Sequence, residues 1–200
     1  MTLTWKFYGT IYVHLDIKES GKGPGDRIGR RLQLKDQIYE NIDELAAGYV
    51  YPCNSFVKSI EASNKFVNDN PSRIEEIIKQ EKEENPKLIP YRFGFSTEAP
   101  QFLVLYYAPK DYNVIKEYIK VKPSGLFFHE KIFQDLPQLV SWFKTNYHRP
   151  EYHKYLKVTK PPVALPKQPV QVKGEKTEPG LGGGVNTPSK RIFKRIIIDL

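Results

Sequence analysis

The chain has 200 residues, a formal net charge of +8, 40% hydrophobic residues and 13% aromatic residues. This supply of apolar side chains can build a core and excludes a wholly disordered protein. No apolar run approaches the roughly 18 residues of a transmembrane helix, and the first ten residues contain no apolar signal core. The single cysteine, Cys53, cannot pair within the chain and is predicted to pack near a helix start. Its lack of an internal partner fits a reducing compartment such as nucleus or cytosol.

The positive charge is concentrated near the end of the sequence. Residues 157–200 contain nine of the 31 Lys and Arg and three of the 23 Asp and Glu, which is a net charge of +6. Residues 1–156 therefore carry a net charge of only +2. A nucleic-acid-binding domain normally gathers positive charge on a folded face, so the composition favours that function for the tail alone.

The first predicted element is a hairpin of two antiparallel strands in residues 2–17. Apolar and polar residues alternate there on both sides of Gly9, which predicts one buried face. A loop rich in Gly and charge follows, and residues 31–39 read as short strands. A helix is predicted from Asn41, its cap, to Pro52. The side chains expected on the buried face are Leu3, Trp5, Phe7, Ile11, Val13, Leu15 and Ile17.

Residues 54–85 are predicted to be helical in two pieces that are separated around residues 68–72. Ser72 is expected to cap the second piece, and Pro86 is expected to end it. The second piece has an apolar stripe opposite a charged face, which indicates a rigid spacer between two domains.

The rest of the sequence predicts a second domain and then a disordered tail. Strands are expected within residues 90–96, 100–108, 115–122 and 125–133, and a helix from Asp135. The Pro, Gly and Lys content after residue 157 predicts disorder. The last ten residues are apolar enough for a short strand or a docking motif, and no function is assigned to them.

Two segments of the chain repeat the same pattern at a spacing of 94 residues. In each copy an apolar pair at the end of a strand is followed by a turn and by a helix with an apolar stripe. This agreement predicts an internal duplication of one small domain. The matched residues are Ile38 with Ile132, Tyr39 with Phe133, Ile42 with Leu136, Leu45 with Leu139, and Tyr49 with Phe143.

The repeated strand, turn and helix resemble the C-terminal half of an SH2 domain. The order of LTWK, HLDI, IPYRF and LVSWFKTNY within residues 2–150 resembles the tandem SH2 module of the suppressor-of-Ty-six family of transcription elongation factors and histone chaperones. The resemblance implies an α+β fold with SH2-like domains in residues 1–52 and 88–156. A helical linker in residues 53–87 would join them, and residues 157–200 would form the disordered basic tail.

The resemblance also implies a function. It indicates a nuclear, non-enzymatic module that binds the phosphorylated linker or C-terminal domain region of the largest RNA polymerase II subunit. In the family, a strand with an Arg-Pro-Ser-Ser stretch precedes LTWK and supplies the phosphate-binding arginine. Here Met1 stands in front of LTWK, so the first copy is expected to lack its N-terminal helix and strand, by truncation or by true loss. Without a bidentate arginine, its phosphate site should be weak.

Three residues of the first copy are candidates for binding phosphate. By strand parity Thr4, Lys6 and His14 share the face opposite the buried residues. The resemblance places His14 beside a phosphate pocket. The alternative is an ordinary histidine on a solvated strand face.

Lys120 and Lys122 are the candidates in the second copy. They point outward from one strand and could hold phosphoserine as point charges, or they could be ordinary surface lysines. The resemblance matches Lys120 to a basic phosphate contact of some family members. Phe93 and Phe95 stand where an SH2 pocket strand would carry its arginine, so a deep phosphotyrosine pocket is not expected.

Catalysis is not expected, because the sequence lacks the required combinations. The four histidines show no metal-ligand spacing, and the glycine-rich segments lack the order of a phosphate-binding loop. We therefore predict no enzyme activity, no metal and no cofactor. The alternative to phosphopeptide binding is a nucleic-acid or nucleosome binder that acts through the basic tail, with the body as a scaffold.

Overall fold

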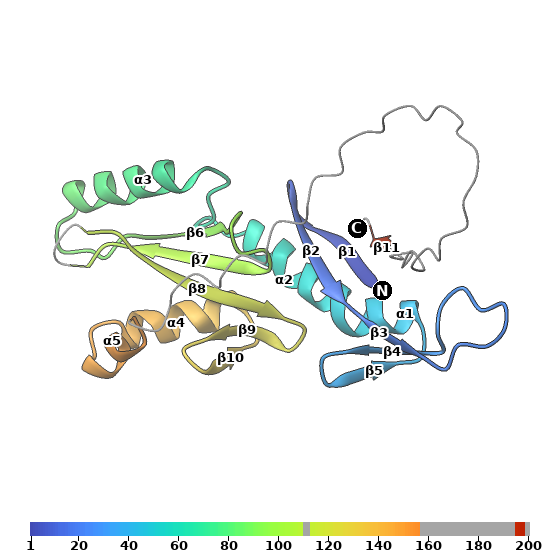
Figure 1. Cartoon of the computed structure of the whole chain (residues 1–200). Coiled ribbons are helices and arrows are strands. Elements are labelled where there is room, and N and C mark those ends of the chain that lie inside the picture. Colours follow the sequence, from blue (N-terminus) through green and yellow to red (C-terminus); the bar gives the residue numbers. More distant parts are fainter. Residues whose placement is uncertain (110–112, 157–194, 199–200) are drawn as a thin grey trace, which may run out of the picture.

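The computed structural model describes residues 1–109, 113–156 and 195–198, which form two similar halves (Figure 1). The first half contains β1 (Thr2–Tyr8), β2 (Ile11–Asp16), β3 (Lys18–Ser20), β4 (Arg31–Leu34), β5 (Gln37–Tyr39), α1 (Ile42–Leu45), the π-helical η1 (Ala46–Val50) and α2 (Tyr51–Glu61). The second half contains α3 (Pro71–Glu84), β6 (Tyr91–Phe95), β7 (Phe102–Tyr107), β8 (Ile115–Lys122), β9 (Gly125–Phe128), β10 (Lys131–Phe133), α4 (Leu136–Asn146) and α5 (Pro150–Leu156). The strand β11 (Arg195–Ile198) returns to the first half. No helix in these ranges is long and apolar enough to cross a membrane.

The predicted N-terminal hairpin is confirmed. β1 and β2 pair antiparallel, with Leu3 opposite Leu15 and Trp5 opposite Val13. All the side chains expected on its apolar face are buried. Gly9, in the turn, has a φ of 50°, a conformation that glycine adopts without steric cost.

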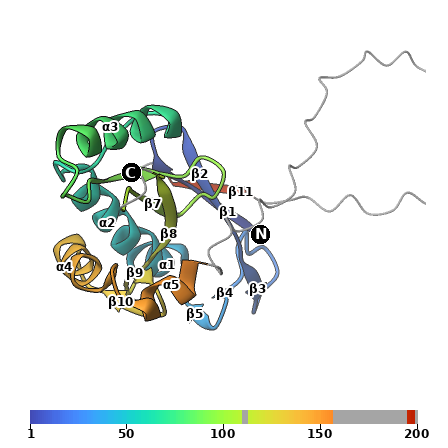
Figure 2. The same ribbon diagram turned by 90° about the vertical axis from the view of Figure 1, so that its left-hand side faces the viewer.

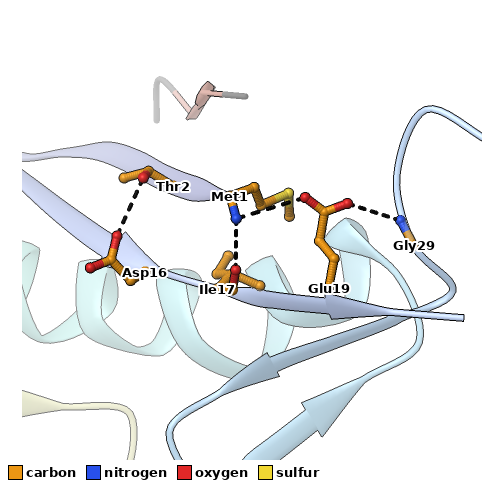
Figure 3. A network of polar contacts seen from close by, with 6 residues as sticks. All are labelled: Met1, Thr2, Asp16, Ile17, Glu19 and Gly29. Atoms are coloured by element: carbon orange, nitrogen blue, oxygen red, sulfur yellow. Dashed lines mark hydrogen bonds and ion pairs between the residues drawn. The ribbon is translucent and has the colours of Figure 1, made fainter. Parts of the chain in front are cut away.

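Polar contacts at the open end of this hairpin connect it to β3 and to the loop after it (Figure 3). The amino group of Met1 donates to the carbonyl oxygen of Ile17 at 2.8 Å and lies 3.7 Å from a carboxylate oxygen of Glu19. The other oxygen of Glu19 accepts from the backbone N–H of Gly29 at 3.2 Å. One carboxylate therefore holds the loop close to β1.

The first sheet has a third strand that comes from the end of the sequence. β11 pairs parallel with β1, with Leu3 opposite Ile196 and Trp5 opposite Ile198. Residues 195–198 thus form a short strand, one of the two alternatives that the sequence suggested for the last ten residues, and they correct the assignment of these four residues to the disordered tail. Ile196 and Ile198 pack on the first-half core, which explains why four residues can form a strand there. The other residues of the predicted tail lie outside the described part of the chain.

The second half is a five-stranded antiparallel sheet in the order β10-β9-β8-β7-β6. Both views show α3 on one face of the sheet and α4 on the other (Figures 1 and 2). Ile74 and Ile78 of α3 pack with Val104, Tyr106 and Ala108 in a separate apolar cluster. The helix that the sequence suggested as a spacer therefore also covers the sheet.

The predicted duplication is confirmed for the hairpins and for the helix starts. The β4–β5 hairpin and the β9–β10 hairpin have bounds that differ by 94 residues throughout. Asn41 and Asp135 cap the following helices, each accepting from a backbone N–H three residues later at 2.8 Å. The copies differ after the first turn, because η1 is π-helical and continues into α2 without a break at Pro52.

The predicted cap of α3 is wrong by two residues. Asn70, not Ser72, accepts a hydrogen bond from the backbone N–H of Arg73 at 2.9 Å. Pro71 then occupies the first turn, where its fixed φ suits the helix and its missing N–H leaves no helix hydrogen bond unmade.

A continuous core joins the two halves. The ring of Phe95 on β6 lies 5.4 Å from that of Phe7 and 4.6 Å from that of Tyr8, both on β1. Gln101, next to β7, donates from Nε2 to the hydroxyl of Tyr49 in η1 at 2.9 Å. These contacts and the shared apolar cluster fix the position of one half on the other.

Candidate functional site

The three candidate residues of the first half come together on one face of β1 and β2. Thr4 pairs with His14 across the strands, and its Oγ1 lies 2.8 Å from Nδ1 of His14. Lys6 is two pairs further along, on the same face, and stands opposite Tyr12. Thr4 is only 5% exposed, whereas Lys6 and His14 are exposed. The face therefore offers an ammonium, an imidazole and a partly covered hydroxyl.

The neighbour of this face is apolar. Ile197 of β11 stands opposite Thr4 and is 61% exposed, so a large aliphatic side chain borders the polar group. A phosphate bound at Lys6 would meet one full positive charge here, without the bidentate geometry of a guanidinium.

The corresponding face of the second half is largely closed. α3 lies over this face, and carboxylates of α3 form ion pairs with cations of the sheet. Arg92 of β6 forms an ion pair with Glu81, and Lys116 of β8 lies 2.6 Å from Glu75. Phe93 points to the opposite side and is fully buried. A phosphate that bound Arg92 or Lys116 would compete with a carboxylate of α3 for the cation.

Lys120 and Lys122 lie at the end of β8. Neither belongs to the apolar cluster that α3 forms with the sheet. Their ammonium groups sit over aromatic rings, Lys120 5.6 Å from the centroid of Phe102 and Lys122 3.7 Å from that of Phe127. Both side chains are half-buried, and the rings hold the charges by cation–π attraction. Burial, together with the charges of Lys35 and Lys122, lowers the pKa of Lys120 below its usual value.

Lys35 is a third cation at this place, and the sequence analysis missed it. It lies in the turn between β4 and β5, which faces the end of β8 across the junction (Figure 1). Its Nζ is 3.5 Å from the hydroxyl of Tyr49, the group that also accepts from Gln101. No local pattern could have revealed this influence, because Lys35 and Lys120 belong to different halves and the charge of one acts on the other only when the halves pack together.

The backbone at the junction is unusual. Lys35 has a φ of 55° and Gln101 a φ of 76°. They are two of the four non-glycine residues with positive φ in the described part of the chain, and both reach the Tyr49 hydroxyl. The other two, His129 and Glu130, form the equivalent turn between β9 and β10, so the φ of Lys35 belongs to a two-residue hairpin turn that both copies share.

A buried polar cluster lies on the α4 side of the second sheet. Glu117 of β8, fully buried, accepts from the hydroxyl of Tyr152 at 2.6 Å, and its other oxygen lies 2.5 Å from Nε2 of His129. Burial, then the charge of Glu117, raises the pKa of Tyr152. The cluster ties α5 and the β9–β10 turn to the sheet, a role that the sequence analysis did not foresee.

Two further features of the described residues concern metal binding and the single thiol. No three His, Cys, Asp or Glu side chains gather there in a way that could hold a metal ion. Burial raises the pKa of the Cys53 thiol to about 12, so the thiol is protonated near neutral pH. Cys53 packs as a small apolar side chain in α2, as the sequence predicted.

The sequence is similar to a known domain family and to known proteins. Residues 1–146 match the family model of the SH2 domain. The transcription elongation factor SPT6 homolog of Arabidopsis thaliana is 34% identical over 155 residues, which are 75% of this chain and 9% of the relative. The transcription elongation factor SPT6 of Drosophila melanogaster is 31% identical over 157 residues, which are 75% of this chain and 8% of the relative. The chain spans less than a tenth of the length of these two relatives.

Two solved structures share the fold. One is a tandem SH2 domain in the transcription elongation factor Spt6, which binds the phosphorylated RNA polymerase II C-terminal repeat domain. It has a TM-score of 0.66 at 22% identity and covers 74% of this chain and 76% of that chain. The tandem SH2 domains of Antonospora locustae Spt6 have a TM-score of 0.58 at 27% identity, with 70% and 71% covered. The predicted fold and the resemblance to this module are thereby confirmed. Since the SH2 model matches most of its length, the chain belongs to the SH2 domain family.

Proposed function

We propose that the chain is a phosphopeptide-binding module of a transcription elongation factor. Its ligand would be the phosphorylated C-terminal repeat domain of the largest RNA polymerase II subunit, or the linker before it. The observation that carries the proposal is the tandem SH2 fold, shared with an Spt6 module that binds the phosphorylated repeat domain. The sequence similarity to SPT6 proteins of a plant and an insect supports it.

Two groups of side chains would contact the ligand. Thr4, Lys6 and His14 offer a donor set on the first half, and Lys120 and Lys122 offer two ammonium groups on the second. Phosphate monoesters carry close to two negative charges at neutral pH, so both groups suit them better than an unmodified peptide.

As part of the same proposal, the protein would be located in the nucleus. It would bind its ligand without catalysing a reaction and would need no cofactor. The relatives are transcription elongation factors, which supports both statements. We also propose the domain division given by the sequence, with SH2-like domains in residues 1–52 and 88–156. The helical segment 53–87 would join the two domains, and the basic tail, residues 157–200, would follow the second.

The experiment is fluorescence anisotropy of the full chain with peptides from the polymerase region. Each peptide is prepared with phosphoserine, phosphothreonine or phosphotyrosine, and in unphosphorylated form as the control. The proposal expects tighter binding of at least one phosphorylated form, by about tenfold, which is 1.4 kcal/mol. Equal affinities for all forms would refute it.

A second candidate function rests on the tail, because residues 157–200 hold +6 of the net charge of +8. The alternative is a nucleic-acid or nucleosome binder. Duplex DNA affinity would then fall steeply with salt, and the variant with Lys160, Lys167, Lys173 and Lys176 changed to Gln would lose it. That variant leaves β11 in place.

A further inference from the structure

A region of positive charge lies within the folded part of the chain. Residues 18–31, which we call the basic segment, comprise β3, the loop after it and the first residue of β4. They contain five Lys and Arg and two Asp and Glu, a net charge of +3. The other residues up to 156 contain 17 Lys and Arg and 18 Asp and Glu, a net charge of −1. The total of +2 for residues 1–156 therefore hides a basic region joined to a slightly acidic remainder.

The two carboxylates of the basic segment hold its backbone in place. Glu19 on β3 accepts from the backbone N–H of Gly29 at 3.2 Å, which ties the end of the loop to its beginning (Figure 3). Asp26 accepts from the backbone N–H of Gly23 at 2.8 Å, and its own N–H donates to the carbonyl oxygen of Gly23. The acidic side chains are therefore engaged within the loop and give it a defined shape.

The cations of the basic segment, by contrast, point into solvent. All five are exposed: Lys18, Lys22, Arg27, Arg30 and Arg31. Within the described residues, Lys18, Lys22 and Arg31 form no ion pair with a carboxylate. Arg30 lies 3.7 Å from Asp26, but its side chain remains 80% exposed, and such a surface pair contributes little. The segment thus presents its positive charge outward.

The basic segment is remote from the junction of the two halves. Figure 1 shows its loop projecting at the end of the first half that lies away from the second half. β4 begins with Arg31 at this loop, and the turn after its other end faces the junction. Lys18 and Arg31 lie on the outer face of the β3–β4 pair, because Leu32 on the opposite face is fully buried. A ligand on this surface would leave the end of β8 accessible.

The side chains of the basic segment suit phosphates better than a protein surface. Three of its five cations are arginines, whose planar guanidinium can bind two phosphate oxygens at once. A protein interface needs apolar or aromatic anchors at its centre. The one large aliphatic side chain of the segment, Ile28, is half-buried against the core, and on the same sheet only Ile38 of β5 is an exposed aliphatic residue.

Electrostatics alone is enough for nucleic acid but not for a protein partner. Exposed ion pairs with an acidic protein contribute only about 0–1 kcal/mol each. Binding to a nucleic-acid backbone gains free energy from the release of condensed counterions for each phosphate that is neutralised. The basic segment contains no aromatic residue on which a base could stack, so a single strand has no advantage over a duplex.

We infer that the basic segment binds the sugar–phosphate backbone of a nucleic-acid duplex without reading its sequence. This activity goes beyond the proposed phosphopeptide binding and does not depend on it. It also differs from the alternative function of the tail, because its residues belong to the folded first half.

The test is binding of a short fluorescent DNA duplex to the full chain between about 50 and 200 mM salt. The loop variant combines Lys18→Gln, Lys22→Gln and Arg31→Gln, which removes three exposed charges that have no carboxylate partner among the described residues. A charge-preserving variant combines Lys18→Arg, Lys22→Arg and Arg31→Lys. Melting temperatures verify that all variants fold.

The matched control removes the same amount of charge elsewhere. It changes three exposed lysines of the second half to Gln, namely Lys79, Lys87 and Lys131. The loop substitutions are also introduced into the tail variant of the alternative function, so that the segment is measured without the charge of the tail.

The loop variant should bind the duplex about tenfold more weakly at about 50 mM salt, and the control should change by less than twofold. The slope of log affinity against log salt should become shallower by about 0.9 for each phosphate contact that is lost. The charge-preserving variant should bind like the parent, and duplexes of unrelated sequence should bind alike. The loop substitutions should weaken the tail variant by the same factor.

Four results would overturn the inference. The first is a full chain that does not bind the duplex, and the second is a loop variant that binds it as well as the control does. The third is a charge-preserving variant as weak as the loop variant, which would make the side chains structural. The fourth is competition by polyglutamate as effective as that by unlabelled duplex, which would assign the segment to an acidic protein. The phosphopeptide should bind the loop variant within twofold of the parent, and an equal loss there would assign the segment to the peptide instead.

Discussion

Changing Tyr152 to Phe removes one hydroxyl from a buried cluster and leaves the packing of the ring. Tyr152 is 2% exposed, and its ring centroid lies 4.4 Å from that of His129. Its hydroxyl donates to the fully buried Glu117 at 2.6 Å. The variant keeps the ring contacts and leaves that carboxylate oxygen without its donor from α5.

The expected loss of stability is about 2 kcal/mol, because a hydrogen bond to a charged group contributes roughly 1.5–3 kcal/mol. No discount for solvent is needed, since neither partner is accessible. Urea unfolding, followed by far-ultraviolet circular dichroism, measures the change. The control is Tyr147→Phe, whose hydroxyl forms no hydrogen bond among the described residues, and it should stay within about 0.5 kcal/mol of the parent.

The pH dependence gives a second, independent result. Burial and the charge of Glu117 raise the pKa of Tyr152 from its ordinary 10.0. Above pH 10 the unfolded chain loses the phenol proton while the folded chain keeps it, so stability falls as pH rises. The parent should lose up to about 1.4 kcal/mol per pH unit more than Tyr152→Phe there. A cost below 0.5 kcal/mol at pH 7 together with parallel curves up to pH 11 would refute the role given to this hydroxyl.

Two further outcomes follow from the duplicated helix caps and from the candidate residues for phosphate binding. Asn41→Ala and Asp135→Ala should each destabilise by about 1 kcal/mol in urea unfolding, and an effect at only one of them would contradict the equivalence of the two caps. Lys120→Gln should reduce phosphoserine-peptide affinity more than His14→Gln, because it removes an ammonium group, whereas one ring nitrogen of His14 is already hydrogen-bonded to Thr4. The reverse order in an anisotropy titration would assign the main contact to the first half.

The elements that could be predicted are those fixed by neighbours in the sequence. The N-terminal hairpin follows from strict alternation around Gly9, and the two helix starts follow from Asn41 and Asp135, each bonded to a residue three positions on. These effects act between residues close in the sequence. Two segments with the same pattern, 94 residues apart, therefore form matching hairpins and helix caps.

The elements that could not be predicted depend on partners far away in the chain. The π-helical turn at residues 46–50 has no sequence signature distinct from an α-helix. β11 joins β1 across nearly the whole chain, and Gln101 reaches the Tyr49 hydroxyl only across the junction. A pattern of alternation tells which face of a strand is buried, but not which distant element will cover it or which charges will meet there.

The shared core makes a last prediction about how the halves unfold. The chain has two tryptophans, Trp5, which is fully buried in the first half, and Trp142, in α4 of the second. In the background Trp142→Phe, fluorescence reports on the first half alone. Ile119→Val removes one methylene from a fully buried position on β8 and should cost about 1 kcal/mol. If the rings of Phe95, Phe7 and Tyr8 and the apolar cluster couple the halves into one cooperative unit, the Trp5 transition must register that cost.

For a chain of this size, 1 kcal/mol corresponds to a decrease of roughly 2–4 °C in melting temperature. The Trp5 signal and the far-ultraviolet circular dichroism should shift together by that amount. A Trp5 transition that stays in place while the circular dichroism develops an earlier phase would show that the second half unfolds alone. The junction would then be an interface between independent domains. Coincident transitions would instead mean that contacts across the junction, such as the hydrogen bond from Gln101 to the Tyr49 hydroxyl, last for as long as the protein is folded.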